Sequence, residues 1–137
     1  MAFNEQLGIK DAVQLSPLNL AFVGDAVYSL LVRTRLVANA NRPAGELNKK
    51  SSARVCAVQQ SKDYYRLLPY LSEAETAVMK RGRNANPHNK AKNATAGEYR
   101  NATGLECLFG YLYLKGENCR IMELFNICWD GDEDETK

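Results

Sequence analysis

The feature that most constrains this chain is a predominantly apolar stretch over residues 18–37, which is too long for one β-strand. Ser16 and Pro17 precede it in the order expected of an N-cap and a first helical residue. The sequence therefore predicts a long helix, and because that helix is apolar nearly all round, we expect it to lie in the core. No strand-length run alternates Val, Ile or Thr with polar residues, so the predicted fold is all-α.

The rest of the chain divides into further helical segments. A second helical region begins at residues 41–43 and continues over 46–68, with Ser51 and Ser52 as the candidate break. Residues 72–75 have the order of a capping box and begin a helix that ends near Gly82, and residues 98–114 and 119–129 form two more. Residues 82–97 have almost nothing to bury and form one long loop. Within 46–68, the positions expected to face the core are Leu47, Val55, Val58, Tyr65 and Leu68.

A length of 137 residues fits one domain, which we place at residues 1–129. Residues 130–137 carry five acids beside a single Lys137, and we expect this acidic tail to be disordered. The formal charge of +2 therefore hides a more basic body, which favours a polyanionic partner. The N-terminus lacks a signal sequence and no apolar run reaches about 18 residues, which predicts a cytoplasmic protein without membrane association.

The cysteines and the single histidine give little support to other kinds of chemistry. Cysteines 56, 107, 119 and 128 lack the spacing of a zinc site or a disulfide framework. Three of them, Cys56, Cys107 and Cys128, have apolar neighbours and are expected to be buried free thiols. His88 lies in the polar loop, which disfavours histidine-based catalysis.

Two carboxylates stand alone in apolar helical segments. Asp25 directly follows Gly24, and Glu106 comes two residues after Gly104, with Gly110 one turn further on. A glycine inside a helix costs about 1 kcal/mol relative to alanine and indicates close approach of another backbone. We therefore expect two tightly packed helices that each present one acid, with Asp25 at least partly buried.

Paired carboxylates suit Mg²⁺, which binds through one or two carboxylates and keeps several waters. Such an ion activates water and stabilises charge on a phosphate. The structural alternative is that Asp25 pairs with a core arginine such as Arg33 or Arg35, while Glu106 caps or bridges helices. The pattern of the residues alone leaves both interpretations open, with a slight preference for the structural one.

Residues 80–93 carry five cations, four asparagines and no acid, in a chain that is 25% charged. Arg and Lys contact phosphate oxygens, while Asn offers donors and acceptors to sugar hydroxyls and base edges. A solvated surface loop is the alternative, but the absence of acids favours polyanion binding. Lys49, Lys50 and Arg54 are candidates for extending the same face.

These motifs together resemble a known family. Residues 20–27 resemble the signature helix of the ribonuclease III family, and residues 103–111 resemble its second acidic helix. The match runs over about residues 18–114, and three motifs in order are far more specific than any one of them. The stretches that are similar to the Mini-ribonuclease III branch are residues 49–52, 80–85 and 99–106.

The resemblance implies a homodimer with the fold of the ribonuclease III endonuclease domain and no separate double-stranded-RNA-binding domain. It implies a Mg²⁺-dependent endoribonuclease that cuts double-stranded RNA, leaves a 5′-phosphate and a 3′ overhang, and matures the 23S precursor of large-subunit ribosomal RNA. A large-subunit ribosomal protein that presents the substrate is a candidate partner. Asp25 and Glu106 would be the catalytic, metal-linked acids, and the expected RNA-binding residues are Lys49, Lys50, Lys80, Arg81, Arg83, Asn84, Lys90, Lys92 and Arg100.

The chain departs from full-length ribonuclease III, which has further acids where this sequence has Leu18, Ala21, Ala44 and Thr103. Two direct carboxylates per site are left, and Thr103 is a candidate for orienting a water on the metal. Two other classes of function compete with the nuclease: a non-catalytic ribonuclease III-like RNA-binding or scaffold module, and a purely structural dimerisation domain. Retention of both acids argues against the first, and the acid-free basic segment argues against the second.

Overall fold

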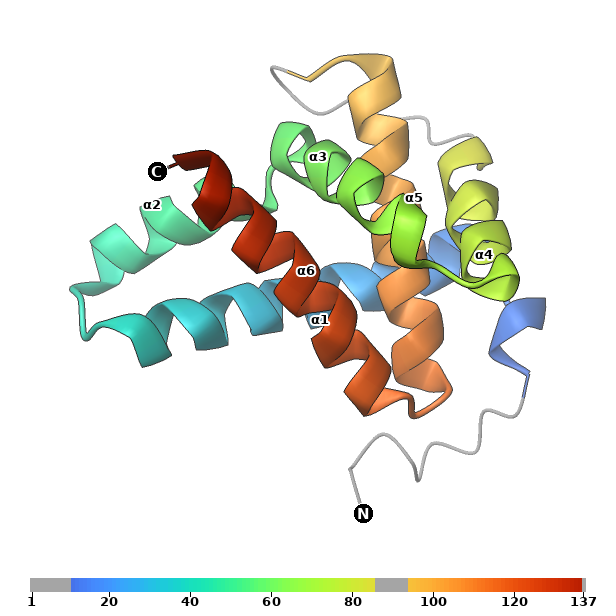
Figure 1. Ribbon diagram of the computed structural model, residues 1–137, viewed down its shortest axis with the longest axis horizontal. Coiled ribbons are helices and arrows are strands. Elements are labelled where there is room, and N and C mark those ends of the chain that lie inside the picture. The colour runs from blue at the N-terminus through green and yellow to red at the C-terminus, as the bar shows by residue number, and fades with distance from the viewer. Residues whose placement is uncertain (1–10, 86–93, 137) are drawn as a thin grey trace.

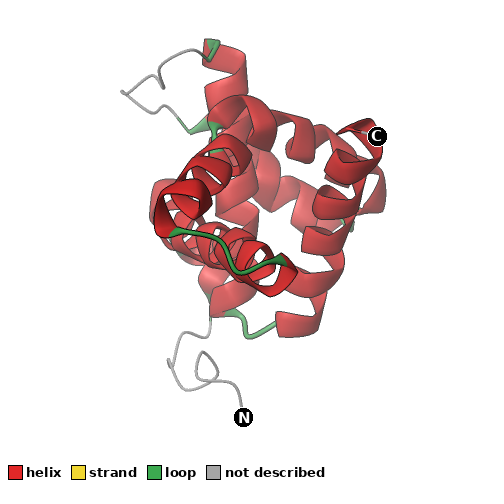
Figure 2. Cartoon of the chain, turned by 90° about the vertical axis from the view of Figure 1, so that its left-hand side faces the viewer, coloured by secondary structure: helices red, strands yellow, loops and turns green. Residues whose placement is uncertain are grey.

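The computed structural model describes residues 11–85 and 94–136, and within them every regular element is helical (Figures 1 and 2). The predicted all-α fold is therefore confirmed. None of the helices in these residues combines the length and the apolar character needed to cross a membrane. In chain order the elements are η2 (Ala12–Gln14), α1 (Pro17–Asn39), α2 (Ala44–Val55), α3 (Ala57–Leu67), η3 (Leu68–Tyr70), α4 (Glu73–Asn84), α5 (Ala96–Leu114) and α6 (Asn118–Thr136).

Local capping interactions set where three of the helices begin. The Ser16 side chain caps α1 by accepting a hydrogen bond from a backbone amide of its first turn, as expected. Ser72 and Glu75 form the predicted reciprocal capping box at the start of α4. A second box, between Thr95 and Glu98, starts α5 two residues before the predicted position.

The central element is α5, which packs against α1, α3, α4 and α6. Figure 1 shows it running through the middle of the molecule, with α1 crossing behind it and α3 passing in front. Its leucines at 105, 108 and 112 are fully buried, and the ring of Phe109 meets the ring of Tyr28 edge-on at 5.4 Å. The sequence of α5 is almost entirely apolar because neighbouring helices cover it on nearly all sides.

Two pairs of glycines let α5 touch its neighbours backbone to backbone. Where α1 crosses it, a Cβ on Gly24 would overlap the carbonyl oxygen of Glu106 and lie 2.8 Å from the amide nitrogen of Gly110. Where α4 crosses it, a Cβ on Gly82 would lie 3.0 Å from the Cα of Gly104. The close backbone approach that the sequence predicted at the mid-helix glycines is therefore confirmed.

A buried ion pair joins four helices through a cluster that the sequence patterns did not predict. Nη1 of Arg54 in α2 lies 2.7 Å from Oδ2 of Asp63 in α3. The Tyr28 hydroxyl of α1 donates to the same carboxylate, and Nη2 of Arg54 donates to the carbonyl oxygen of Cys128 in α6 at 3.1 Å. Burial and then the Asp63 charge raise the pKa of Tyr28, so its phenol keeps the proton that it donates.

The structure corrects the predictions for α2 and α3. The helix breaks at Cys56, where the backbone is extended, whereas Ser51 lies buried within α2. Tyr65, predicted to face the core, is 62% exposed. The inward face of α3 is partly polar, which is why apolar spacing misplaced it; its buried residues are Gln60, Ser61, Asp63, Tyr64 and Leu67.

The cysteines also differ from expectation at one position. Cys107 and Cys128 are buried free thiols as predicted, but Cys56 is exposed. Its place at the junction of α2 and α3 explains the difference, because the chain there turns between helices at the surface of the domain.

Helix α6 continues through the acidic C-terminus to Thr136, so the prediction that residues 130–136 are disordered is wrong. Asp132 accepts a hydrogen bond from Gln59 of α3, and its Oδ2 lies 3.6 Å from Nε of Arg54. Within α6 itself, Nε1 of Trp129 donates to Glu133 at 3.0 Å. These contacts with α2 and α3 hold the acidic residues against the body of the domain and support the helix beyond Trp129.

The predicted loop over residues 82–97 is shorter than expected. Helix α4 extends to Asn84, and α5 begins at Ala96. The packing of Gly82 against α5 keeps the last turn of α4 helical. The positive charges of Arg81 and Arg83 in that turn stabilise it further, because they lie at the negative end of the helix dipole. Residues 86–93 lie outside the described part of the chain.

Candidate active site

The crossing of α1 and α5 brings the two predicted acids into one place. Gly24 contacts the main chain of Glu106 and Gly110, and Asp25 is the next residue of α1. The carboxyl groups of Asp25 and Glu106 are hydrogen-bonded to each other. Two carboxyls can form such a bond only when one of them carries a proton, so the pair holds a proton in the absence of a cation.

The two acids sit in different surroundings. Glu106 is largely buried, and burial, the hydrogen bond to Asp25 and the charge of Asp25 raise its pKa to about 9. A hydrogen bond from Gln60 acts in the opposite direction. Asp25 is exposed, which corrects the expectation that it is at least partly buried. The reason is that α1 has only one face in the core, and Asp25 lies at the edge of the other.

That outer face of α1 is apolar and open. Phe22 is 82% exposed and Leu30 is 60% exposed, so the expectation that α1 lies wholly in the core is wrong. A pocket of about 450 Å³ follows this face, and among the described residues Asp25 is the one charged residue that lines it. The other residues that line it are Phe22, Val23, Ala26, Val27, Leu30 and Tyr113.

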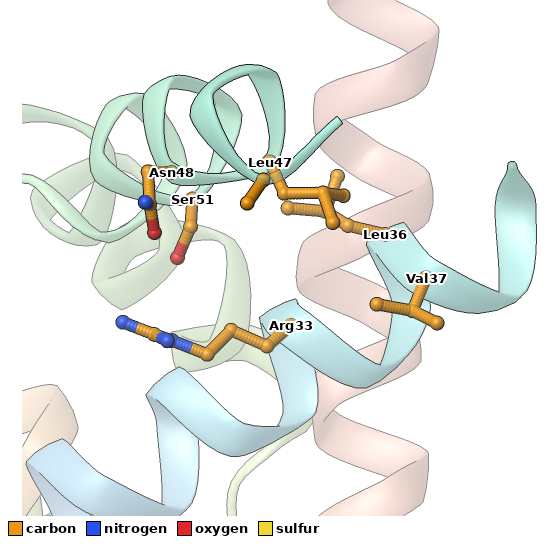
Figure 3. A pocket seen from close by; sticks show the side chains of 7 residues that line it. Arg33, Leu36, Val37, Leu47, Asn48 and Ser51 are labelled. Atoms are coloured by element: carbon orange, nitrogen blue, oxygen red, sulfur yellow. The ribbon is translucent and has the colours of Figure 1, made fainter. Parts of the chain in front are cut away.

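The structural alternative, in which Arg33 or Arg35 neutralises Asp25, does not match the structure. Arg35 faces α6, where its guanidinium donates to Asn126 and lies 5.2 Å from the ring centroid of Phe125. Arg33 instead lines a pocket of about 160 Å³ between α1 and α2. Figure 3 shows Ser51 of α2 pointing toward Arg33 there. Both arginines therefore face helices other than α5.

The acid pair fits a divalent cation better than it fits an internal ion pair. No arginine or lysine from the described residues is among the groups that set the pKa of Glu106. Two adjacent carboxylates repel each other when both are ionised, and a cation between them removes that repulsion. Residues 11–85 and 94–136 contain no cluster of three or more His, Cys, Asp or Glu suited to a metal. A cation such as Mg²⁺, which takes few protein ligands and keeps its waters, matches two carboxylates alone.

Two further polar residues lie near the acids, Thr103 on α5 and Gln60 on α3. Thr103 is buried one turn before Glu106, and its hydroxyl donates to the carbonyl oxygen of Tyr99 at 3.1 Å. Gln60 of α3 is 4% exposed and was not predicted, because the polar residues around it in the sequence read as helix surface. The signal that it is buried is its spacing to Tyr64 and Leu67, which share one face of α3.

The predicted RNA-binding residues fall into two groups. Lys80, Arg81, Arg83 and Asn84 are exposed at the end of α4, and Arg100 is exposed near the start of α5. Lys49 and Lys50 are exposed on α2, which Figure 1 places on the other side of α5 from α4. The structure therefore does not bring all of them onto one patch. Lys90 and Lys92 lie outside the described residues.

Comparison with known proteins places this chain among a defined set of relatives. The sequence model of the family described as "Ribonuclease III domain" matches residues 18–117. A protein named Mini-ribonuclease 3 from Thermoanaerobacter sp. (strain X514) is 43% identical over 125 residues, which cover 90% of this chain and 88% of that protein. A Mini-ribonuclease 3 from Brevibacillus brevis is 44% identical over 84% of this chain and 86% of its own length.

A solved structure gives the same answer at the level of the fold. The crystal structure of a Fusobacterium nucleatum protein superposes with a TM-score of 0.79 and 32% sequence identity, covering 90% of this chain and 99% of that one. The match of the family model spans both acid-bearing helices, α1 and α5. The chain therefore belongs to the ribonuclease III family, within its Mini-ribonuclease 3 branch.

Proposed function

We propose that this protein is a Mg²⁺-dependent endoribonuclease that hydrolyses phosphodiester bonds in double-stranded RNA. The observation that carries the proposal is the acid pair of Asp25 and Glu106, which α1 and α5 bring together without a neutralising cation from the described residues. Family membership supports the reaction class, since the relatives are named as ribonucleases. The products expected of this class carry a 5′-phosphate and a short 3′ overhang.

The proposed roles of the two acids follow from their surroundings. Asp25, exposed at the edge of α1, is open to substrate and solvent, whereas Glu106 is anchored in the core. Mg²⁺ bound there supplies Lewis-acid stabilisation of phosphate charge and a water of lowered pKa. For that to happen Glu106 must release its proton, so cation binding and deprotonation of Glu106 are coupled. Thr103, on the same helix, is proposed to orient a water beside the pair.

The exposed cations are proposed to position the RNA and not to react with it. Arg81, Arg83 and Arg100 lie near the junction of α4 and α5, where α4 packs against the helix that carries Glu106. Phosphate contacts from such residues fix the register of a duplex without reading its sequence. Lys49 and Lys50 on α2 offer a second set of phosphate contacts on the other side of α5. Lys90 and Lys92 are proposed to extend the first set.

We expect the active form to be a homodimer. Leu18, Phe22, Ala26 and Leu30 recur at intervals of four residues and are all exposed, which places one apolar stripe along the outside of α1. A contiguous apolar stripe on a water-soluble domain marks an interface. In a dimer with twofold symmetry, the same stripe of a second copy would pack against it. Because Asp25 borders this face, the partner would approach the edge of the catalytic site.

The decisive experiment is cleavage of a duplex RNA by the purified protein with Mg²⁺ and with EDTA. We expect cleavage only with Mg²⁺, and we expect Asp25→Asn to lose cleavage while RNA affinity, measured by fluorescence anisotropy, is unchanged. Arg83→Ala with Arg100→Ala should weaken RNA binding in a salt-dependent way. Duplex binding without cleavage by the wild type would instead support the non-catalytic RNA-binding module.

The proposed biological substrate is the 23S precursor of large-subunit ribosomal RNA, in the cytoplasm. The support is the similarity to the Mini-ribonuclease 3 proteins, together with the resemblance of the sequence motifs to that branch. A large-subunit ribosomal protein is the proposed partner that presents the RNA. Cleavage of the precursor transcript with and without purified large-subunit proteins, mapped by primer extension, tests both statements.

A further inference from the structure

A buried amide on α3 reaches the catalytic pair from a third helix. Gln60 is 4% exposed, and its side chain is hydrogen-bonded to the carboxyl group of Glu106. When the Glu106 carboxyl group is ionised, both of its oxygens can only accept hydrogen bonds. The donor in the bond is therefore the NH₂ group of Gln60, since a carboxylate only accepts.

The neighbours of Gln60 hold α3 in register with α5. Asn101 of α5 donates through Nδ2 to Oγ of Ser61 at 3.0 Å, and both residues are buried. One turn further along α3, Asp63 is fixed by Arg54 at 2.7 Å. These contacts on either side fix α3 at the position from which Gln60 reaches Glu106. A glutamine also suits the place chemically, because it donates a hydrogen bond without adding charge or taking up the proton of the acid pair.

Packing alone does not account for a glutamine at this position. A buried amide loses its bonds to water, and it is stable only where a partner replaces them. A leucine or methionine of similar size would fill the same space without that requirement. Glu106 is the partner that explains the polar group, and Glu106 in turn must keep its oxygens directed toward Asp25 and the proposed cation.

We propose that Gln60 is a positioning residue that orients the Glu106 carboxylate for binding of the divalent cation. The inference rests on the proposed function, since it gives Gln60 its role through the metal-linked acid. One oxygen of Glu106 is held by the amide, and the carboxylate is thereby presented to Asp25 across the α1–α5 crossing. Groups that orient a metal ligand in this way change metal affinity or activity by about 10- to 100-fold when they are removed.

The test compares Gln60→Leu and Gln60→Met with Gln59→Leu in the full-length protein. Gln59 is the adjacent glutamine, but it bonds to Asp132 of α6 and not to the acid pair, so it serves as the matched control. Binding of Mn²⁺, as a surrogate for Mg²⁺, is measured from the free-ion EPR signal. We expect the Kd for Mn²⁺ to rise about 10- to 100-fold in both Gln60 variants and to stay within about twofold in Gln59→Leu.

A second readout separates positioning from a merely structural role. In cleavage assays the Gln60 variants should need more Mg²⁺ for half-maximal rate, while their affinity for duplex RNA equals that of the wild type. Folded Gln60 variants that bind Mn²⁺ as tightly as the wild type would overturn the inference.

Nuclear magnetic resonance of the wild type keeps the inference testable if those variants do not fold. The side-chain amide signals of Gln60 should shift when Mg²⁺ is added, and those of Gln59 should not. A Gln60 amide that does not respond to Mg²⁺ overturns the inference as well. Failure of the wild type to cleave any duplex, with the Gln60 effect on Mn²⁺ intact, would instead reject only the nuclease function.

Discussion

At the scale of single residues, the position of the acid pair depends on the absence of a side chain at Gly24. The Cβ of any other residue there would collide with the main chain of Glu106, and the main chain of a packed helix cannot move aside as a flexible side chain can. The site is therefore set by glycines as much as by acids. Gly24 and Gly110 provide the contact, and Asp25 and Glu106 are brought together as its consequence.

Replacing Gly24 tests this directly. We expect Gly24→Ala to lower the free energy of unfolding by about 3 kcal/mol or more, because α1 and α5 must separate. Cleavage should fall even under conditions where the variant stays folded. Gly45→Ala in α2 is the control, since a Cβ there meets no other part of the described structure within 4 Å and the change should stabilise the helix slightly. Urea unfolding measures both variants; equal stability of Gly24→Ala and wild type would contradict the crossing.

The proton on Glu106 makes the stability of the metal-free protein depend on pH. Its pKa is about 9 in the folded protein, against 4.5 for a free glutamate, so the folded state binds more protons between these values. The contribution of Glu106 to stability is then greatest below pH 4.5 and is lost as the pH rises toward 9.

We expect the urea midpoint in EDTA to fall between pH 5 and pH 9, and Glu106→Gln to flatten that dependence. Adding Mg²⁺ should raise the urea midpoint most at the alkaline end of this range. A larger fraction of Glu106 is already ionised there, so fewer protons have to leave when the cation binds. A wild-type slope that Glu106→Gln leaves unchanged would show that other groups cause it.

At the scale of elements, the sequence predicted most of the helices but not all of their inward faces. Apolar periodicity and capping residues gave α1, α4 and α5 to within a few residues, because these helices follow rules that act over one or two turns. The face of α3 was misassigned, since Asp63 pairs with Arg54 of α2 and Gln60 bonds to Glu106 of α5. No local pattern marks a charge whose partner comes from another helix.

The buried ion pair of Arg54 and Asp63 offers a test at this scale. Arg54→Met leaves Asp63 buried with weaker compensation, and we expect a loss of about 3–5 kcal/mol in the free energy of unfolding. The double variant Arg54→Met with Asp63→Leu should recover part of that loss, because neither charge is then buried alone. Arg33→Met, at an exposed position of α1, is the matched control. Differential scanning calorimetry would decide, and an Arg54→Met protein as stable as the control would show the pair to be dispensable.

At the scale of the whole molecule, the sequence did not determine which face of α1 is exposed, and that face is where we propose that a second copy binds. The nearness of the two acids follows from glycine placement and was predicted, whereas the exposure of Asp25 was not. Exposure could not be predicted because the outer face of α1 is as apolar as its inner face, so sequence alone does not say which one meets the core. Because exposed apolar patches commonly mark interaction surfaces, the proposed homodimer is placed on this stripe.

The homodimer is tested on that stripe. Phe22→Glu should convert the protein to a monomer without unfolding it, because the side chain is 82% exposed in the single chain. Tyr65→Glu is the control, since Tyr65 is also a large exposed aromatic but lies on α3, away from the stripe. Light scattering after size-exclusion chromatography gives the mass of each variant. A wild type that is monomeric at micromolar concentration would contradict the assembly.

The contact of α1 with α5 through main-chain atoms has a consequence for how such a protein can change over time. Main-chain contact at Gly24 and Gly110, with no side chain between, sets how closely α1 and α5 approach beside Asp25 and Glu106. Leucines elsewhere in the interior can be exchanged for other apolar residues while that spacing is preserved. Substitutions in the surrounding core can therefore accumulate without moving the two acids apart, as long as Gly24 and Gly110 are kept.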